Sequence, residues 1–134
     1  MKRAIILRGT SNAGKTTLSD LFPEPKVVCC ADDYFTDVDG NYNFNANYLN
    51  LAHSHCKEKF VSALKDDNVD TIVVANTNTT PKEFGYYTDK AEEMGIMVFS
   101  LVVERRHESK NHHNVPFDII ERQSRNITNN LKLI

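Results

Sequence analysis

Residues 9–16, close to the N-terminus, combine two glycines, a lysine and hydroxyl side chains at a fixed spacing. They read Gly-Thr-Ser-Asn-Ala-Gly-Lys-Thr and follow a short apolar run at residues 4–7. In a Gly-x4-Gly-Lys-Ser/Thr loop between a strand and a helix, the glycines let backbone N–H groups turn inward onto phosphate oxygens. Lys15 would reach the β- and γ-phosphates, and the Thr16 hydroxyl would bind Mg²⁺. The pattern predicts a site for a nucleoside triphosphate such as ATP, together with Mg²⁺.

We call residues 9–16 the phosphate loop. Its backbone amides, with the positive end of the following helix, supply the expected anion-binding groups. The expected nucleotide contacts are Gly9, Thr10, Ser11, Asn12, Ala13, Gly14, Lys15, Thr16 and Thr17.

A pair of aspartates, Asp32 and Asp33, follows a second apolar run at residues 26–30. In phosphoryl transfer, one carboxylate held in line with the γ-phosphate accepts the proton of the incoming hydroxyl. The pair is therefore a candidate for a catalytic base. The alternative interpretation is a solvated pair that caps a turn, which is the commonest use of adjacent aspartates.

Polar residues also follow the two later apolar runs. Asn76 stands where many phosphate-loop proteins carry a metal-directed aspartate, and its amide could orient Asp32 or bind a metal-bound water. The alternative is a plain polar turn before the next helix. Residues 104–114 are rich in basic side chains, and Arg105, Arg106 or Lys110 would neutralise charge on a transferred phosphate. A solvated surface loop is the alternative for each of these cations.

The histidines of this loop, His107, His112 and His113, have no cysteine or carboxylate at matching spacing. They do not predict a metal site.

Apolar runs alternate with helical periodicity along the whole chain. Strands are expected at residues 4–7, 26–30, 71–75 and 96–103, with residues 31–44 irregular and a turn at 39–41. Helices are expected after the phosphate loop, over about 47–65, from a capping box at 80–83 to Gly95, and from Pro116 onward. This order predicts a three-layer α/β/α sandwich with a mostly parallel sheet. The loops after the strands should then converge on one cleft.

Length, charge and cysteine content limit the classes of protein to which this chain can belong. The chain has 134 residues and a formal net charge of -2, so we expect a single domain, 1–134, without a bulk-charge signal for nucleic acid. No apolar run is long enough to span a bilayer, and the N-terminus is too short for a signal peptide. Cys29, Cys30 and Cys56 lack metal-ligand spacing, so we expect reduced thiols in a cytoplasmic protein with no membrane partner. No pattern sets the oligomeric state.

Taken in order, these motifs resemble the P-loop kinase family of polynucleotide 5′-hydroxyl kinases and their short phage and eukaryotic relatives. The resemblance covers nearly the whole chain. It rests on residues 9–16, Ala31-Asp32-Asp33-Tyr34-Phe35, Asn76-Thr77-Asn78 leading into Pro81, and Asn111 followed by Val115-Pro116.

The resemblance implies residue roles. In that family the first aspartate of the pair is the general base, which here is Asp32, and the lid arginine matches Lys110. Phe35 replaces an arginine that holds the acceptor phosphate, and Asn76 replaces an aspartate. The lid cation is therefore Lys110, or has moved to Arg105 or Arg106.

These observations predict an ATP- and Mg²⁺-dependent kinase, with Lys15, Asp32, Lys110 and Arg106 as its catalytic groups. The expected acceptor is a 5′-hydroxyl at a nucleic acid end, or else a hydroxyl of a nucleoside, modified base or other small molecule. A nucleotide-binding regulator or slow ATPase without an acceptor is the alternative from another class. A nucleic acid binder that only uses the fold is a third interpretation, against which the acidic balance argues.

Overall fold

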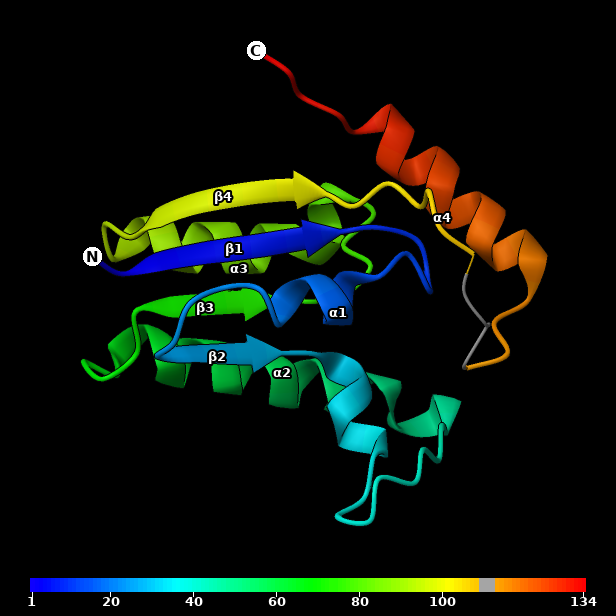
Figure 1. Cartoon of the computed structure of the whole chain (residues 1–134), viewed down its shortest axis with the longest axis horizontal. Coiled ribbons are helices and arrows are strands. Elements are labelled where there is room, and N and C mark those ends of the chain that lie inside the picture. The colour runs from blue at the N-terminus through cyan, green and yellow to red at the C-terminus, as the bar shows by residue number, and fades with distance from the viewer. Residues whose placement is uncertain (109–112) are drawn as a thin grey trace.

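A parallel sheet forms the centre of the computed structural model, which describes residues 1–108 and 113–134. Within these residues the sheet has four strands in the order β2-β3-β1-β4, all running in the same direction (Figure 1). The strands are β1 (Arg3–Arg8), β2 (Lys26–Cys29), β3 (Thr71–Val74) and β4 (Met97–Val102). The predicted strands and their parallel arrangement are confirmed.

Helices connect the strands and follow the last one. They are α1 (Lys15–Ser19), α2 (Leu49–Lys65), α3 (Pro81–Glu93) and α4 (Phe117–Asn129), with the 3₁₀ helices η1 (Ala31–Phe35) and η2 (Ala46–Tyr48). Across the described parts of the chain, none of the helices is both long enough and apolar enough to cross a bilayer.

The start of α3 follows from its sequence. Thr80 is the N-cap residue and Pro81 occupies the first turn. The Glu83 carboxylate accepts hydrogen bonds from the backbone N–H groups of Thr79 at 3.0 Å and Thr80 at 3.2 Å. This capping box satisfies donors that the helix leaves open. It also fixes the turn at 76–78 that precedes the helix.

Helices cover both faces of the sheet. On one face, Phe60 of α2 and Tyr87 of α3 are 0% and 1% exposed, and their rings meet edge to face at 5.0 Å and 85°. They belong to one apolar cluster with Ile6 of β1. On the other face, Leu18 of α1 packs with Ile5 of the same strand. The fold is therefore the predicted three-layer α/β/α sandwich.

The segment 31–44 differs from the sequence expectation, because it begins with η1 instead of an irregular loop. The Thr36 N–H donates to the Asp33 carbonyl at 3.2 Å and closes a 3₁₀ turn. The expected turn at 39–41 is present, with the Gly40 N–H donating to the Asp37 carbonyl at 3.0 Å. Short-range hydrogen bonds thus order a segment that has no apolar periodicity.

Periodicity predicted the helices correctly but not how much of each apolar face is covered. Leu49 of α2 and Met94 after α3 are 40% and 46% exposed. In α4, Ile127 is buried, whereas Phe117 is 73% exposed. The reason is that α4 lies beyond the carboxyl ends of the strands and not across a sheet face (Figure 1). Only part of its apolar side therefore meets the body of the protein.

The strand ends bring the candidate residues together, as the topology requires. The phosphate loop follows β1, η1 follows β2, the 76–78 turn follows β3 and residues 103–108 follow β4. Because parallel strands end at one edge, all four segments lie at the same edge of the sheet.

We predict that Phe60→Ala lowers the free energy of unfolding by about 3–5 kcal/mol, because it leaves a cavity against Tyr87 in a fully buried site. Leu51→Ala, on the same helix but with 51% of the side chain exposed, should cost less than about 1 kcal/mol. Urea unfolding followed by circular dichroism measures both. Equal losses in the two variants would contradict the assigned core.

Candidate active site

Two glycines make the phosphate loop compact. A Cβ on Gly9 would lie 3.0 Å from the carbonyl oxygen of Val103 and 3.2 Å from the Cβ of Ala13. Gly14 has a φ of 100°, a left-handed value that other residues rarely adopt. The loop therefore follows a path that larger residues at these two positions would block.

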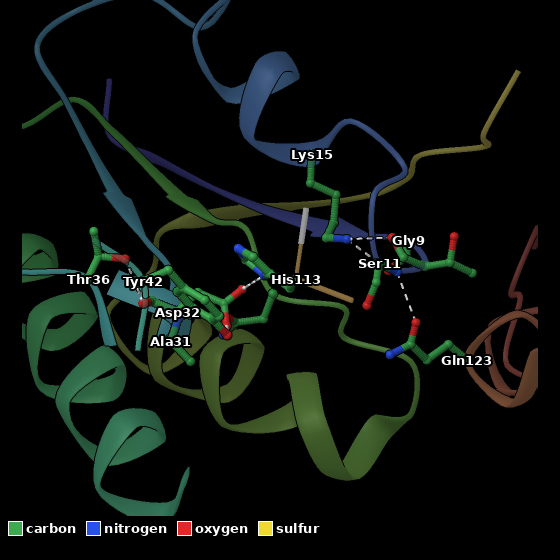
Figure 2. Close-up of polar contacts among 11 residues, drawn as sticks. Gly9, Ser11, Lys15, Ala31, Asp32, Thr36, Tyr42, His113 and Gln123 are labelled. Atoms are coloured by element: carbon green, nitrogen blue, oxygen red, sulfur yellow. Dashed lines mark hydrogen bonds and ion pairs between the residues drawn. The ribbon is translucent and has the colours of Figure 1, made fainter. Parts of the chain in front are cut away.

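Lys15 turns its ammonium group back into this loop (Figure 2). Its Nζ donates to the carbonyl oxygens of Gly9 at 3.0 Å and Thr10 at 2.8 Å, and the residue is 8% exposed. Burial lowers the pKa of Lys15 to about 8, and the negative charge of Asp32 opposes that shift. A positive charge is thus held at the centre of the loop near neutral pH.

Asp32, in η1 directly after β2, meets two aromatic side chains (Figure 2). The Tyr42 hydroxyl donates to Oδ1 at 3.3 Å, and Nδ1 of His113 lies 3.6 Å from Oδ2. The rings of Tyr42 and His113 are stacked, with centroids 3.9 Å apart and planes at 6°. Burial, followed by the Asp32 charge, raises the pKa of Tyr42 to about 12, so its hydroxyl remains a donor at neutral pH.

The turn after β3 is bonded to the segments on both sides of it. The Oδ1 of Asn76 accepts from the backbone N–H of Ala31 at 2.8 Å, and the Thr77 carbonyl accepts from the Gly9 N–H at 3.0 Å. The amide nitrogen of Asn76 contacts the Cys56 sulfur at 3.5 Å, which ties it to α2. Asn76 therefore orients the backbone that carries Asp32.

Phe35, which stands where the resemblance implied an arginine that holds the acceptor phosphate, belongs to the core. It is 7% exposed and packs edge to face with Tyr34 at 5.5 Å and Phe44 at 5.1 Å. Its buried ring offers no polar group to a ligand.

The cysteines are unpaired, as expected, with Cys29 and Cys56 buried and Cys30 half-buried. Burial, with a smaller effect from the Asp32 charge, raises the pKa of Cys30 to about 12. Its thiol is therefore protonated at neutral pH and is a poor nucleophile.

The basic loop after β4 places His107 against the phosphate loop. Cε1 of His107 lies 3.1 Å from where a Cβ on Gly14 would stand. Arg106, a predicted catalytic cation, pairs with Glu104 and its side chain is 84% exposed, so the structure does not bring it into the site. Lys110, the other predicted cation, falls outside the described residues.

Helix α4 also reaches the phosphate loop. The backbone N–H of Ser11 donates to Oε1 of Gln123 at 2.9 Å (Figure 2). Further along, the side-chain amide of Asn130 contacts the Thr79 carbonyl at 3.5 Å. The last helix is thus fastened to the loop after β1 and to the turn after β3.

A polar cavity of about 270 Å³ opens beside Asn76, between α2 and α3. Lys57 and Lys82 bring positive charge to it, while the Glu83 carboxylate is engaged in capping α3. The cavity is lined by Asn50, His53, Lys57, Asn76, Thr77, Asn78, Lys82, Glu83 and Tyr87. This lining suits a polar, anionic ligand.

Sequence reasoning did not identify Tyr42, His113 or Gln123 as members of the site. His113 was considered only as a metal ligand, Tyr42 lies in a segment read as irregular, and Gln123 lies among polar residues of a helix. Each meets its partner through the tertiary fold, so no local pattern marked it.

Sequence comparison finds a relative for only part of the chain. No family model matches it. Over 86 residues, 62% of the chain, it is 30% identical to NEDD4-binding protein 2 of Homo sapiens. The chain spans 5% of the length of that relative.

Comparisons of structure cover nearly the whole chain. A mutant of the APS kinase CysC of Mycobacterium tuberculosis matches with a TM-score of 0.52 and 14% identity over 95% of both chains. A structure of the same kinase in complex with AMPPNP and APS matches with a TM-score of 0.50 and 14% identity, over 92% of this chain and 68% of that one. A chain of the Pnkp1/Rnl/Hen1 complex matches with a TM-score of 0.58 and 19% identity, over 88% of this chain and 44% of that one. The protein has the P-loop kinase fold.

The pKa of Lys15 predicts how nucleotide affinity depends on pH. Because this pKa is lowered to about 8 in the free protein, the ammonium charge is lost as the pH rises through that value. Phosphate anions favour the charged form, so ATP affinity should weaken about eightfold from about pH 7.5 to about pH 9. Titration calorimetry in buffers of different ionisation enthalpy would also show proton uptake on binding.

Lys15→Met is the matched control for this titration. Its weaker binding should not change over the same pH interval. An affinity of the unaltered protein that stays constant up to about pH 9 would contradict the assigned environment of Lys15.

Proposed function

We propose that this protein is an ATP- and Mg²⁺-dependent phosphotransferase that moves the γ-phosphoryl group of ATP to a hydroxyl group. The acceptor that we favour is the 5′-hydroxyl at the end of a nucleic acid. The observation that carries the proposal is the position of Asp32 relative to Lys15.

Asp32 and Lys15 follow different strands, β2 and β1, yet their charges interact. Both segments lie at the edge of the sheet where the parallel strands end, and the Asp32 charge is among those that oppose the effect of burial on the pKa of Lys15. The Asp32 side chain is also 50% exposed, so an acceptor can reach it. Phosphoryl transfer needs a proton acceptor near the groups that hold the phosphates, and an exposed carboxylate at the same edge of the sheet supports that role for Asp32.

The residues of the phosphate loop fit a triphosphate and its metal ion. The compact glycine path and the buried ammonium of Lys15 form a positive cradle. Thr16, exposed at the start of α1, would give one oxygen to Mg²⁺, which commonly takes its other ligands from phosphates and water. ATP supplies the phosphoryl group when bound.

The chain's own part in the reaction is binding and proton transfer. Lys15 holds the phosphates, and Asp32 accepts the hydroxyl proton as the acceptor oxygen bonds to the γ-phosphorus. The bond from that phosphorus to the β-phosphate oxygen breaks, and ADP leaves. Asp32 then returns its proton to water.

The polar cavity supports an acceptor that carries phosphate. Phe35 is buried in the core and offers no charge, whereas Lys57 and Lys82 line the cavity. The cavity borders Asn76, whose amide also holds the segment of Asp32. A nucleic acid end, with a phosphate next to its terminal hydroxyl, matches this combination of charge and position.

We expect Asp32→Asn to reduce phosphoryl transfer by about a hundredfold or more, because the amide cannot accept the hydroxyl proton. ATP affinity should stay within a few fold. The measurement uses γ-labelled ATP with 5′-hydroxyl oligonucleotides, nucleosides and small alcohols, followed by separation of labelled acceptor from free phosphate. Asp33→Asn, at the adjacent and exposed position, should keep most of the activity.

Two outcomes would overturn the proposal. Transfer by Asp32→Asn at nearly the unaltered rate would mean that another group takes the proton. Label that appears only in free phosphate, whatever the acceptor, would favour a nucleotide-binding regulator or slow ATPase.

The two lysines that line the cavity lead to a separate prediction about acceptor binding. Lys57→Ala combined with Lys82→Ala should raise the KM for a 5′-hydroxyl oligonucleotide about tenfold or more, because charge-assisted contacts to a phosphate are lost. The KM for ATP should hardly change. Lys65→Ala, at the exposed last turn of α2, is the matched control. An unchanged KM for the oligonucleotide in the double variant would place the acceptor elsewhere.

A further inference from the structure

The Asp32 carboxylate is approached by a different neighbour at each oxygen. Oδ1 accepts from the Tyr42 hydroxyl at 3.3 Å, and Oδ2 lies 3.6 Å from Nδ1 of His113. The Tyr42 contact is a long hydrogen bond, the His113 separation is an ion-pair distance beyond hydrogen-bond range, and each carboxylate oxygen keeps a lone pair for another proton. The two contacts therefore restrict how the carboxylate turns while leaving it free to accept another proton.

Contacts with Thr36 and Phe35 hold Tyr42, the ring on which His113 stacks, in place. Tyr42 forms an isolated antiparallel bridge with Thr36, and its ring packs edge-on to the buried Phe35 at 6.3 Å. The parallel imidazole, at 3.9 Å, rests against this fixed ring. His113 thus approaches Asp32 from a defined direction.

His113 also connects Asp32 to the nucleotide side of the site. It lies a few residues before α4, and Gln123 of α4 accepts from the Ser11 N–H of the phosphate loop at 2.9 Å. One stretch of chain, residues 113–123, therefore touches the candidate base at one end and the phosphate loop at the other (Figure 2).

We propose that His113, stacked on Tyr42, is a positioning residue that holds the Asp32 carboxylate toward the acceptor hydroxyl. The inference rests on the proposed function, in which Asp32 takes the hydroxyl proton. The imidazole itself does not touch the substrate. Its N–H and the Tyr42 O–H set the orientation of the carboxylate before the acceptor arrives.

Three variants separate the donor from the ring. His113→Phe keeps an aromatic ring for the stack but removes the donor, and it should lower kcat about tenfold to a hundredfold, because a small misplacement of a reacting group is costly. The KM for ATP should stay within about twofold. His113→Asn keeps a donor near the position of Nδ1 and should recover most of the lost kcat. His55→Phe, an exposed position on α2, should leave kcat unchanged.

A second readout does not depend on turnover. In ¹H–¹⁵N spectra of the histidine rings, Asp32→Asn should move the His113 signals, whereas Asp33→Asn should leave them in place. Kcat of His113→Phe equal to that of the unaltered protein, or His113 signals indifferent to Asp32→Asn, would overturn the inference while leaving the kinase proposal intact. Absence of transfer by the unaltered protein would instead overturn the proposed function.

Discussion

The turn that follows the central strand β3 sets the spacing of the whole site. Asn76 accepts from the backbone of Ala31, and the Thr77 carbonyl accepts from the backbone of Gly9. These two bonds fasten the η1 segment and the phosphate loop to the same strand end, at 2.8 Å and 3.0 Å. The phosphate loop and the backbone segment that carries Asp32 are therefore held by the same strand end.

The loop is organised before any ligand arrives. Lys15 is buried and bonded to two carbonyls of its own loop, so much of the cost of desolvating its charge is met by folding. A preorganised charge acts on phosphate oxygens without first reorganising water. Burial also makes this ammonium more acidic than an exposed lysine, and the proposed binding of a nucleotide would therefore be coupled to proton binding.

The segment after the sheet has a different role from the scaffold. Helix α4 buries little apolar surface, with Ile127 inside and Phe117 exposed, yet its polar side chains contact functional loops. The sheet holds the loops of the candidate site, whereas α4, at the periphery, contacts both the phosphate loop and the turn after β3. Such weakly packed elements open at lower free energy than the core does, which is compatible with ligand exchange at this edge.

Much of the fold could be predicted from the chain alone. Strand and helix positions, the capping box at Thr80 and the phosphate loop depend on residues within a few positions of each other, so local patterns were sufficient. The exposure of apolar side chains was harder to predict, as Leu49 and Phe117 show, because it depends on where neighbouring elements lie.

The contact partners of the candidate site residues could not be predicted from the sequence for the same reason. Gln123 meets Ser11 across 112 residues, and His113 reaches Asp32 only after the sheet has brought their segments to one edge. The sequence by itself determined which groups are candidates to bind phosphate or accept a proton, since side-chain chemistry and short spacings are local. Only the tertiary structure decided which side chains contact each other, because that depends on long-range packing.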